Sequence, residues 1–278
     1  MSDVTRGSRW VDFWERGTWW KAVVAAVGYL VLYQLAGIAD GRVLGNLVDG
    51  PGPLSSETNV VVYLLVPLLV GAVVLVAFVG SVRWTRPLFG AQPVPRRGWM
   101  WIAVALTAAP IVLRLFGIEY GEYSGGVIAL TFLSGLLIGF TEELLTRGIA
   151  VKILRSAGHS ERGVAVISSL LFALLHSANL LSGQAPVTVL LTMVYAFGFG
   201  MMMYLVLRAT GNLLWPILLH GLTDPTTILA TGGIDTAHTG AESPLLPFAG
   251  IFSLVFIVAA VPAIILVRGR ARTEGALR

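Results

Sequence analysis

The sequence contains no cysteine and few charged residues, and each shortage excludes a class of protein. Without cysteine the chain cannot form disulfide bonds, bind a metal through thiolates or use a cysteine nucleophile. Charged residues make up 12% of the 278 positions, about half the share in soluble proteins. The net charge of +4 is too small, in a chain that is 56% hydrophobic, to indicate a nucleic-acid partner.

The hydrophobic residues are instead gathered into runs that are long enough to cross a bilayer. A transmembrane helix needs about 20 predominantly apolar residues. Runs of this kind occupy residues 21–39, 59–80, 99–117, 125–146, 163–182, 187–207, 212–230 and 246–267. They predict an all-α, polytopic membrane helix bundle of about eight transmembrane helices.

The basic residues predict how this bundle is oriented. Short cytoplasmic loops carry an excess of Lys and Arg. If the spans alternate in direction, one side of the membrane holds sixteen of the 19 basic residues and the other side holds only Arg42. We therefore predict a multi-pass protein of the cell membrane with both termini in the cytoplasm.

Three segments follow from these patterns. Residues 21–267 form a single transmembrane domain, with its motif-bearing core at about 130–230. Residues 1–20 are predicted to be an amphipathic interfacial segment, because Trp10, Phe13 and Trp14 fall on one helical face. Residues 268–278 form a basic cytoplasmic tail.

Seven ionisable side chains fall inside or at the end of these spans. A charge at the centre of a bilayer costs about 2.5–3.5 kcal/mol on insertion scales, so each one needs an explanation. We interpret Arg114 as a cation that reaches the outer interface or pairs with Glu119 or Glu122. The other six belong to three short motifs: Glu142, Glu143, Arg147, His176, His220 and Asp224.

The first motif is Glu142-Glu143-x-x-x-Arg147 in the fourth span. Glu143 and Arg147 are four residues apart, so they can form an ion pair on one helical face. Glu142 lies about 100° around the helix from Glu143 and is free to face another group.

The other two motifs lie in the fifth and seventh spans. Phe172 precedes His176 by four residues, and His220 precedes Asp224 by four residues. Pro225 disfavours a helical conformation at Asp224, so we expect the seventh span to be irregular there. Irregular backbone inside a membrane is tolerated where it lies within protein or lines a wet cavity.

Counting residues from the cytoplasmic ends predicts that the three motifs meet in the cytoplasmic half of the bundle, provided that the fourth helix continues to about Arg155. A glutamate among apolar helices can act as a base toward water when an imidazole orients that water. His176, His220 and Asp224 are also a plausible zinc set. The compact His-Glu-x-x-His motif is absent, so the ligands of such a site would come from separate helices.

Each motif also has a purely structural interpretation. The Glu143–Arg147 pair can simply stabilise a helix, a membrane histidine can hydrogen-bond between helices, and Phe172 can be packing. The presence of all three motifs at similar depth favours a functional site.

Taken together, the motifs resemble those of the membrane-embedded CAAX prenyl protease and bacteriocin-processing family, also called the abortive-infection or CPBP family. The similar segments are GFTEELLTRG, SLLFALLHSAN and GNLLWPILLHGLTD, within about residues 130–230. The resemblance implies a helix bundle with a cavity open to the cytoplasm.

The resemblance also implies roles for the motif residues. Glu142 would activate water with the help of His176, and His220 with Asp224 would bind the oxyanion or help to hold a metal. Glu143, Arg147 and Phe172 would support the site. The prenyl-processing members carry asparagine where this chain has Asp224. An amide donates to an oxyanion, whereas a carboxyl group donates only when it is protonated.

The predicted function is therefore intramembrane hydrolysis of a peptide bond in a membrane-bound or lipidated substrate, by a metalloprotease or by a glutamate protease. Membrane lipid and this substrate are the expected partners. Two alternatives remain at this stage. One is a non-catalytic immunity or scaffold protein of the membrane, and the other is a proton-coupled transporter, since buried acids and histidines also relay protons.

Overall fold

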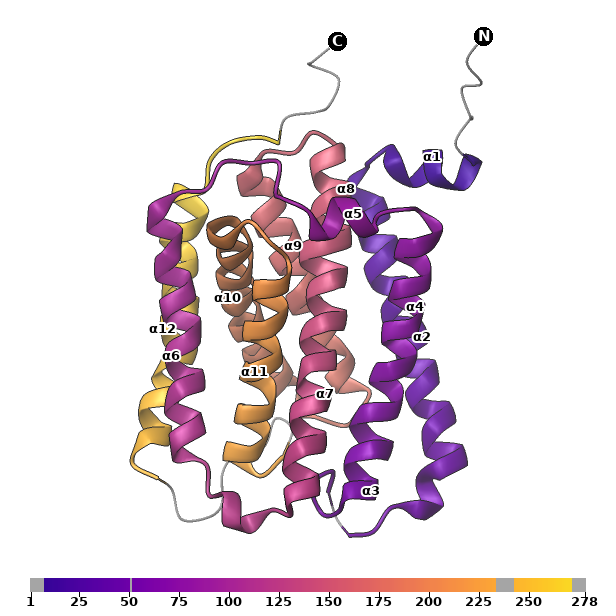
Figure 1. The fold of residues 1–278 in the computed structure, drawn as a ribbon, viewed down its shortest axis with the longest axis vertical. Helices are drawn as coiled ribbons and strands as arrows, with labels where there is room; N and C mark the ends of the chain where they lie inside the picture. Colours follow the sequence, from indigo (N-terminus) through magenta and orange to yellow (C-terminus); the bar gives the residue numbers. More distant parts are fainter. Residues whose placement is uncertain (1–7, 51, 234–242, 272–278) are drawn as a thin grey trace.

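The computed structural model describes residues 8–50, 52–233 and 243–271. Within these ranges the chain forms helices and no strand. The main helices are α1 (Arg9–Glu15), α2 (Trp19–Leu44), α3 (Glu57–Val60), α4 (Val66–Ser81), α5 (Thr85–Phe89), α6 (Trp101–Gly117), α7 (Gly125–Glu143), α8 (Val151–Ser156), α9 (Glu161–Leu175), α10 (Pro186–Thr210), α11 (Leu214–Thr231) and α12 (Leu245–Leu266). The long helices run side by side as one bundle (Figure 1).

Seven helical segments in the described ranges are long and apolar enough to cross a membrane. They are Trp19–Leu47, Glu57–Ser81, Gly98–Gly117, Gly125–Ser156, Glu161–Leu180, Pro186–Thr210 and Leu245–Leu266. These segments coincide with seven of the eight predicted runs, so the predicted polytopic helical bundle is confirmed.

The remaining predicted run, 212–230, forms α11 but is not among these seven helices. α11 has 18 residues, including four threonines and two prolines as well as His220 and Asp224. It packs against α6, α7 and α10, and His220, Thr223 and Thr226 are buried there. The run 212–230 is therefore a helix of the bundle, as predicted, but its polar residues make it less apolar than the seven spanning helices.

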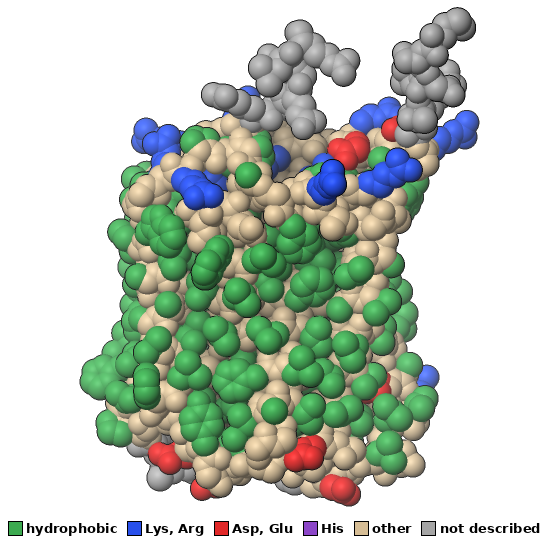
Figure 2. Space-filling view, in the orientation of Figure 1, with side chains coloured by type: hydrophobic (Ala, Val, Ile, Leu, Met, Phe, Trp, Pro, Cys, Tyr) green, Lys and Arg blue, Asp and Glu red, His purple; other side chains and the backbone are tan. Residues whose placement is uncertain are grey.

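Charge is segregated between the two ends of the bundle. Lys and Arg side chains gather at one end, Asp and Glu side chains predominate at the other, and hydrophobic side chains cover the face between them (Figure 2). We call these the basic end and the acidic end. α1 and the end of α12 both lie at the basic end (Figure 1). Three of the sixteen basic residues counted on one side of the membrane, Arg6, Arg272 and Arg278, lie outside the described residues.

The helix that carries the first motif is longer than its apolar run. α7 continues without a break through a π-helical segment, Leu144–Ala150, into α8, which ends at Ser156. The expected continuation to about Arg155 is therefore confirmed. π-helical turns inside α-helices are frequent at functional sites, and this one contains Arg147.

α7 and α11 approach each other closely through glycine. A Cβ atom on Gly139 would lie 2.4 Å from the backbone nitrogen of Gly221, and one on Gly135 would lie 2.3 Å from the ring of Pro225. Small residues allow this kind of backbone contact between membrane helices. The contact brings the end of α7, with its two glutamates, against the middle of α11.

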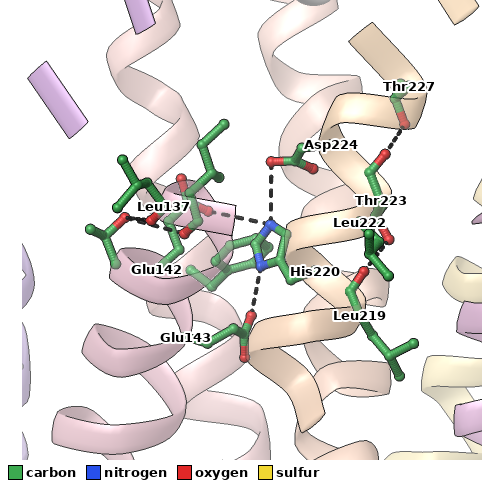
Figure 3. Close-up of polar contacts among 12 residues, drawn as sticks. Leu137, Glu142, Glu143, Leu219, His220, Leu222, Thr223, Asp224 and Thr227 are labelled. Atoms are coloured by element: carbon green, nitrogen blue, oxygen red, sulfur yellow. Dashed lines mark hydrogen bonds and ion pairs between the residues drawn. The ribbon is translucent and has the colours of Figure 1, made fainter. Parts of the chain in front are cut away.

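The expected irregularity at Asp224 is not found, since α11 runs through Pro225 as one helix. Threonine hydroxyl groups along α11 donate to carbonyl oxygens of the preceding turn, for example from Thr223 to Leu219 at 2.8 Å and from Thr227 to Thr223 at 2.7 Å (Figure 3). The threonine hydroxyl groups are therefore satisfied within the helix itself, and the helix continues past Pro225 to Thr231.

A buried charge cluster joins three helices at the basic end. The Glu161 carboxylate accepts hydrogen bonds from Arg155 and Arg208, each at 2.9 Å, and from the hydroxyl group of Tyr204. Glu161 is fully buried. The cluster fixes α8, α9 and α10 relative to one another, and thereby supports the two helices that carry the first and second motifs.

α1 lies across the basic end (Figure 1). One of its aromatic side chains is buried in the protein and two are exposed. Trp14 is buried and its ring lies 4.9 Å from that of Phe78, whereas Trp10 and Phe13 are exposed. The exposed pair is compatible with an interfacial helix. The division into three segments stays a prediction.

Candidate active site

The Glu143 carboxylate connects the first and third motifs. Its Oε1 atom accepts a hydrogen bond from Nη1 of Arg147 at 3.1 Å, which confirms the predicted ion pair. The same oxygen lies 2.8 Å from Nδ1 of His220. Glu143 and Arg147 are almost fully buried. Glu143 therefore does more than stabilise its own helix, because it also orients an imidazole on α11.

The contact with Glu143 determines how the His220 ring is used. A carboxylate only accepts hydrogen bonds, so Nδ1 of His220 donates to it and Nε2 faces the opposite way. Nε2 lies 3.7 Å from Oε2 of Glu142 and 3.5 Å from Oδ2 of Asp224 (Figure 3). The side chains of Glu142 and Asp224 are 26% and 30% exposed. Both carboxylates thus have accessible surface, whereas the imidazole between them is buried.

The second motif adds another imidazole, directly after the end of α9. His176 begins a short 3₁₀ segment, His176–Leu180, and its Nδ1 lies 3.1 Å from the carbonyl oxygen of Phe172. Since a carbonyl group can only accept, Nδ1 carries the proton and Nε2 is left with a lone pair. His176 and His220 both interact electrostatically with Glu142.

Phe172 occupies the centre of the cluster. Its ring meets the rings of His176 and His220 edge to face, at centroid distances of 5.0 and 5.6 Å. The guanidinium group of Arg147 lies 4.7 Å from the same ring centroid. Phe172 is therefore packing, as its structural interpretation states, but it packs against all three motifs at once.

The structure thus brings all seven motif residues into one cluster formed by α7, α9 and α11. Residues 124–226 match the family model for Type II CAAX prenyl endopeptidase Rce1-like proteins. We call this range the Rce1-like segment. The match contains the whole cluster and confirms the family resemblance that the motifs predict. No curated protein matches the chain. The match supports an intramembrane protease of the CAAX type in general.

One further ionisable residue, outside the Rce1-like segment, interacts with the cluster. Arg114, on α6, is only 8% exposed and interacts electrostatically with Tyr195 and Asp224. It forms no ion pair with Glu119 or Glu122 in the part of the chain that the structure describes. The interpretation of Arg114 as an interfacial or locally paired cation was therefore wrong. The Arg114 side chain points inward because of the way α6 packs in the bundle. The residues next to Arg114 in the sequence do not specify that packing.

Two tyrosines of α2 also lie at the Rce1-like site although sequence patterns did not single them out. Tyr29 and Tyr33 stack with a centroid distance of 6.0 Å. Both interact electrostatically with Glu142, and Tyr29 also interacts with Thr141. Their spacing of four residues inside an apolar run was the available signal, because it places two hydroxyl groups on one face of a membrane helix.

The described residues also form a cavity of about 610 Å³ at the basic end, between α5, α8 and the π-helical segment. Arg147 lines it together with Lys152, Arg155 and Glu15. Glu142, His176, His220 and Asp224 are not among its lining residues. The cavity therefore contacts the cluster only through Arg147, on the opposite side of the Glu143–Arg147 pair from His220.

The predicted zinc ligands His176, His220 and Asp224 can be assessed by their arrangement. Among residues 8–50, 52–233 and 243–271, no three or more His, Asp or Glu side chains are grouped so that they could hold a metal ion. The Nδ1 atom of His220 is already engaged by Glu143. The donor set does not fit a metal as it stands, and zinc binding at the Rce1-like site stays a prediction.

Proposed function

We propose that the protein is an intramembrane endopeptidase in which Glu142 activates a water molecule to hydrolyse a peptide bond of a membrane-bound or lipidated substrate. The proposal is supported chiefly by one observation, that a partly exposed glutamate lies beside a buried imidazole whose other nitrogen is held by a second glutamate. The match to the Rce1-like family model supports the same class of reaction.

In the proposed first step, Glu142 removes a proton from water while the oxygen of that water attacks the carbonyl carbon of the substrate. The lone pair on Nε2 of His176 accepts the second hydrogen of the same water and fixes its direction. This assignment uses the tautomer that the Phe172 carbonyl imposes on His176. The product of the step is a tetrahedral intermediate with a negatively charged oxygen.

His220 is the group best placed to stabilise that oxygen. When it is protonated on both nitrogens, it donates Nδ1–H to Glu143 and can donate Nε2–H to the oxyanion. Asp224 then acts as a carboxylate that aligns Nε2–H, so the role no longer requires the amide donor of the prenyl-processing relatives. Collapse of the intermediate breaks the C–N bond, and the leaving amine takes the proton from Glu142.

We further propose that the basic end lies in the cytoplasm, because short cytoplasmic loops carry the excess of Lys and Arg. A substrate whose peptide is held near the cytoplasmic surface by a lipid anchor would then reach Glu142 from that side. The hydrophobic sides of the bundle are suited to an acyl or isoprenoid chain that stays in the bilayer during the reaction.

The test is peptide cleavage by the purified protein in detergent or liposomes, with farnesylated and unmodified membrane peptides as substrates. Glu142→Gln keeps the size of the side chain but cannot take a proton, so we expect kcat/KM to fall by about 10²–10⁴-fold. Glu119→Gln, on an exposed turn near the acidic end, is the matched control and should cleave like the unmodified protein. Full cleavage by Glu142→Gln would contradict the assignment of the base.

A further inference from the structure

The cavity at the basic end has an excess of positive charge on its walls. Three of its lining side chains are cationic, Arg147, Lys152 and Arg155, and one, Glu15, is acidic. Each of the two arginines is paired with a carboxylate that is fully buried and does not line the cavity. Lys152 differs from them, because the side chain of its partner Glu15 is 46% exposed. Lys152 is therefore the cation of the cavity whose partner is most easily replaced.

Glu15 occupies the position of an anion at the wall of this cavity. Its two carboxylate oxygens lie 3.2 and 3.0 Å from Nζ of Lys152, and Oε1 also accepts a hydrogen bond from Nε1 of Trp84. Glu15 is the last residue of α1, where the helix dipole disfavours a negative charge. Exposed ion pairs contribute little to stability. Another anion can therefore take the place of this carboxylate at little cost.

A further donor lies within reach of Lys152. Arg155 is three residues from Lys152, so the two side chains share one face of α8. Nη1 of Arg155 donates to the side-chain oxygen of Gln92 at 2.6 Å. Because the amide oxygen is engaged in this way, the NH₂ group of Gln92 is available to donate to a ligand. Lys152, Trp84 and Gln92 thus provide donors for more than the two oxygens of one carboxylate.

The position of the cavity indicates where such an anion comes from. α1, α5 and α8 all lie at the basic end (Figure 1). Trp10 and Phe13 of α1 are exposed, and aromatic side chains of membrane proteins are enriched at the level of the lipid headgroups. Glu15 belongs to the same short helix. The Lys152 ammonium group is therefore at about the depth of the lipid phosphates.

We propose that this cavity binds a phosphate group at Lys152, in the position that Glu15 holds, and that the phosphate belongs to the headgroup of an anionic lipid. A phosphodiester carries one negative charge, as a carboxylate does, so the exchange leaves the charge of the site unchanged. The cavity volume of about 610 Å³ is typical of small-molecule sites, and Leu88 and Val151 provide apolar walls for the glycerol backbone. A soluble phosphate has the same chemistry but lacks acyl chains that hold it at this depth. The site does not depend on the proposed protease function.

The test measures the affinity of the purified full-length protein, in a neutral detergent, for short-chain lipids, from the rise in melting temperature on titration. Dihexanoyl phosphatidylglycerol is the anionic probe, and dihexanoyl phosphatidylcholine, whose choline group cancels the charge, is its control. We expect phosphatidylglycerol to bind about tenfold more tightly. Lys152→Gln should weaken its binding about 5- to 10-fold, as expected for one cation near an anionic headgroup. Glu15→Gln should strengthen it by a similar factor, because the internal competitor is removed.

The opposite effects of these two variants distinguish a binding site from an ion pair that only stabilises the fold. If the pair is only structural, both substitutions lower the melting temperature without lipid and neither changes the preference for phosphatidylglycerol, which would overturn the inference. Weaker binding by Glu15→Gln, or equal affinity of the unmodified protein for the two lipids, would overturn it as well. Arg97→Gln, at an exposed position between α5 and α6, is the matched control and should bind like the unmodified protein.

Glycerol 3-phosphate and inorganic phosphate distinguish the two sources of the anion. If both bind far more weakly than phosphatidylglycerol, the phosphate is that of a lipid, as proposed. If either binds equally tightly, and Lys152→Gln weakens that binding too, the cavity takes a soluble phosphate and the assignment to a lipid is wrong.

Discussion

A single oxygen atom of Glu143 accepts from two residues, Nη1 of Arg147 at 3.1 Å and Nδ1 of His220 at 2.8 Å. Arg147 lies one turn away on the same helical segment, whereas His220 lies 77 residues away on α11. The carboxylate therefore fixes the orientation of the His220 ring relative to the π-helical segment that carries Arg147. In this arrangement Glu143 is a positioning residue, and Glu142 is the group that meets water.

Replacing Glu143 with glutamine should show whether this residue acts on kcat, by orienting His220, or on substrate binding. The amide can offer its NH₂ group to His220, which removes the fixed direction of Nδ1–H and favours the wrong tautomer. We expect kcat to fall at least about 10²-fold, as when a triad carboxylate is replaced by its amide, with little change in KM. Loss of the buried partner of Arg147 should also lower the free energy of unfolding by about 3–5 kcal/mol.

Rescue distinguishes these two effects of the Glu143 substitution. Glu143→Asp retains the charge, so it should recover most of the stability but only part of kcat, because the shorter side chain does not reach His220 equally well. A variant at Glu143 with normal kcat and a folded structure would contradict its positioning role.

Gly139→Ala tests whether close packing of α7 on α11 sets the geometry of the site. The added methyl group would lie 2.4 Å from the backbone of Gly221, so the two helices must move apart. Overpacking of this kind costs about 1–3 kcal/mol. The melting temperature in detergent and the cleavage rate should both fall. Gly28→Ala is the matched control, because no atom lies within 4 Å of the added methyl group, and equal behaviour of the two variants would argue against this role of the contact.

Metal dependence can be measured on active protein. The described residues offer no group of three side chains arranged to hold a metal, so we expect cleavage to survive dialysis against a strong chelator. Loss of cleavage that returns on addition of zinc would instead support the zinc set His176, His220 and Asp224. Elemental analysis of the same preparation provides the stoichiometry that either result requires.

Orientation can be tested cleanly because the chain has no cysteine of its own. Thr85 begins α5 at the basic end and Thr58 lies in α3 at the acidic end (Figure 1), and both are exposed. We expect Thr58→Cys to react with an impermeant maleimide added to intact cells, and Thr85→Cys to react only after the membrane is opened. The reverse pattern would place the basic end outside the cytoplasm.

Spacing within one helix was enough to predict local contacts. The four-residue separations correctly predicted the Glu143–Arg147 pair and placed His220 and Asp224 on one face. The long apolar runs predicted seven of the spanning segments for the same reason, since length and hydropathy are properties of consecutive residues. α11 was not among these segments because its polar residues, of which His220, Thr223 and Thr226 are buried against other helices, lower its hydropathy.

Contacts between distant helices could not be predicted in the same way. Arg114 was expected at an interface, yet α6 turns it toward Asp224. Tyr29 and Tyr33 reach Glu142 from a helix more than 100 residues earlier. The rotation of a helix about its axis is set by the surfaces against which it packs, and an almost uniformly apolar helix such as α2 gives little indication of that rotation in its own sequence.

The sequence by itself determined that this chain is a helical membrane protein and that its acids and imidazoles occur in three motifs, because hydropathy and the helical repeat act along the chain. Only the tertiary structure decided that Glu143 holds His220, that α11 passes Pro225 unbroken and that Arg114 faces the site. These outcomes depend on glycine contacts and side-chain packing between helices far apart in sequence, which form only when the whole bundle has assembled.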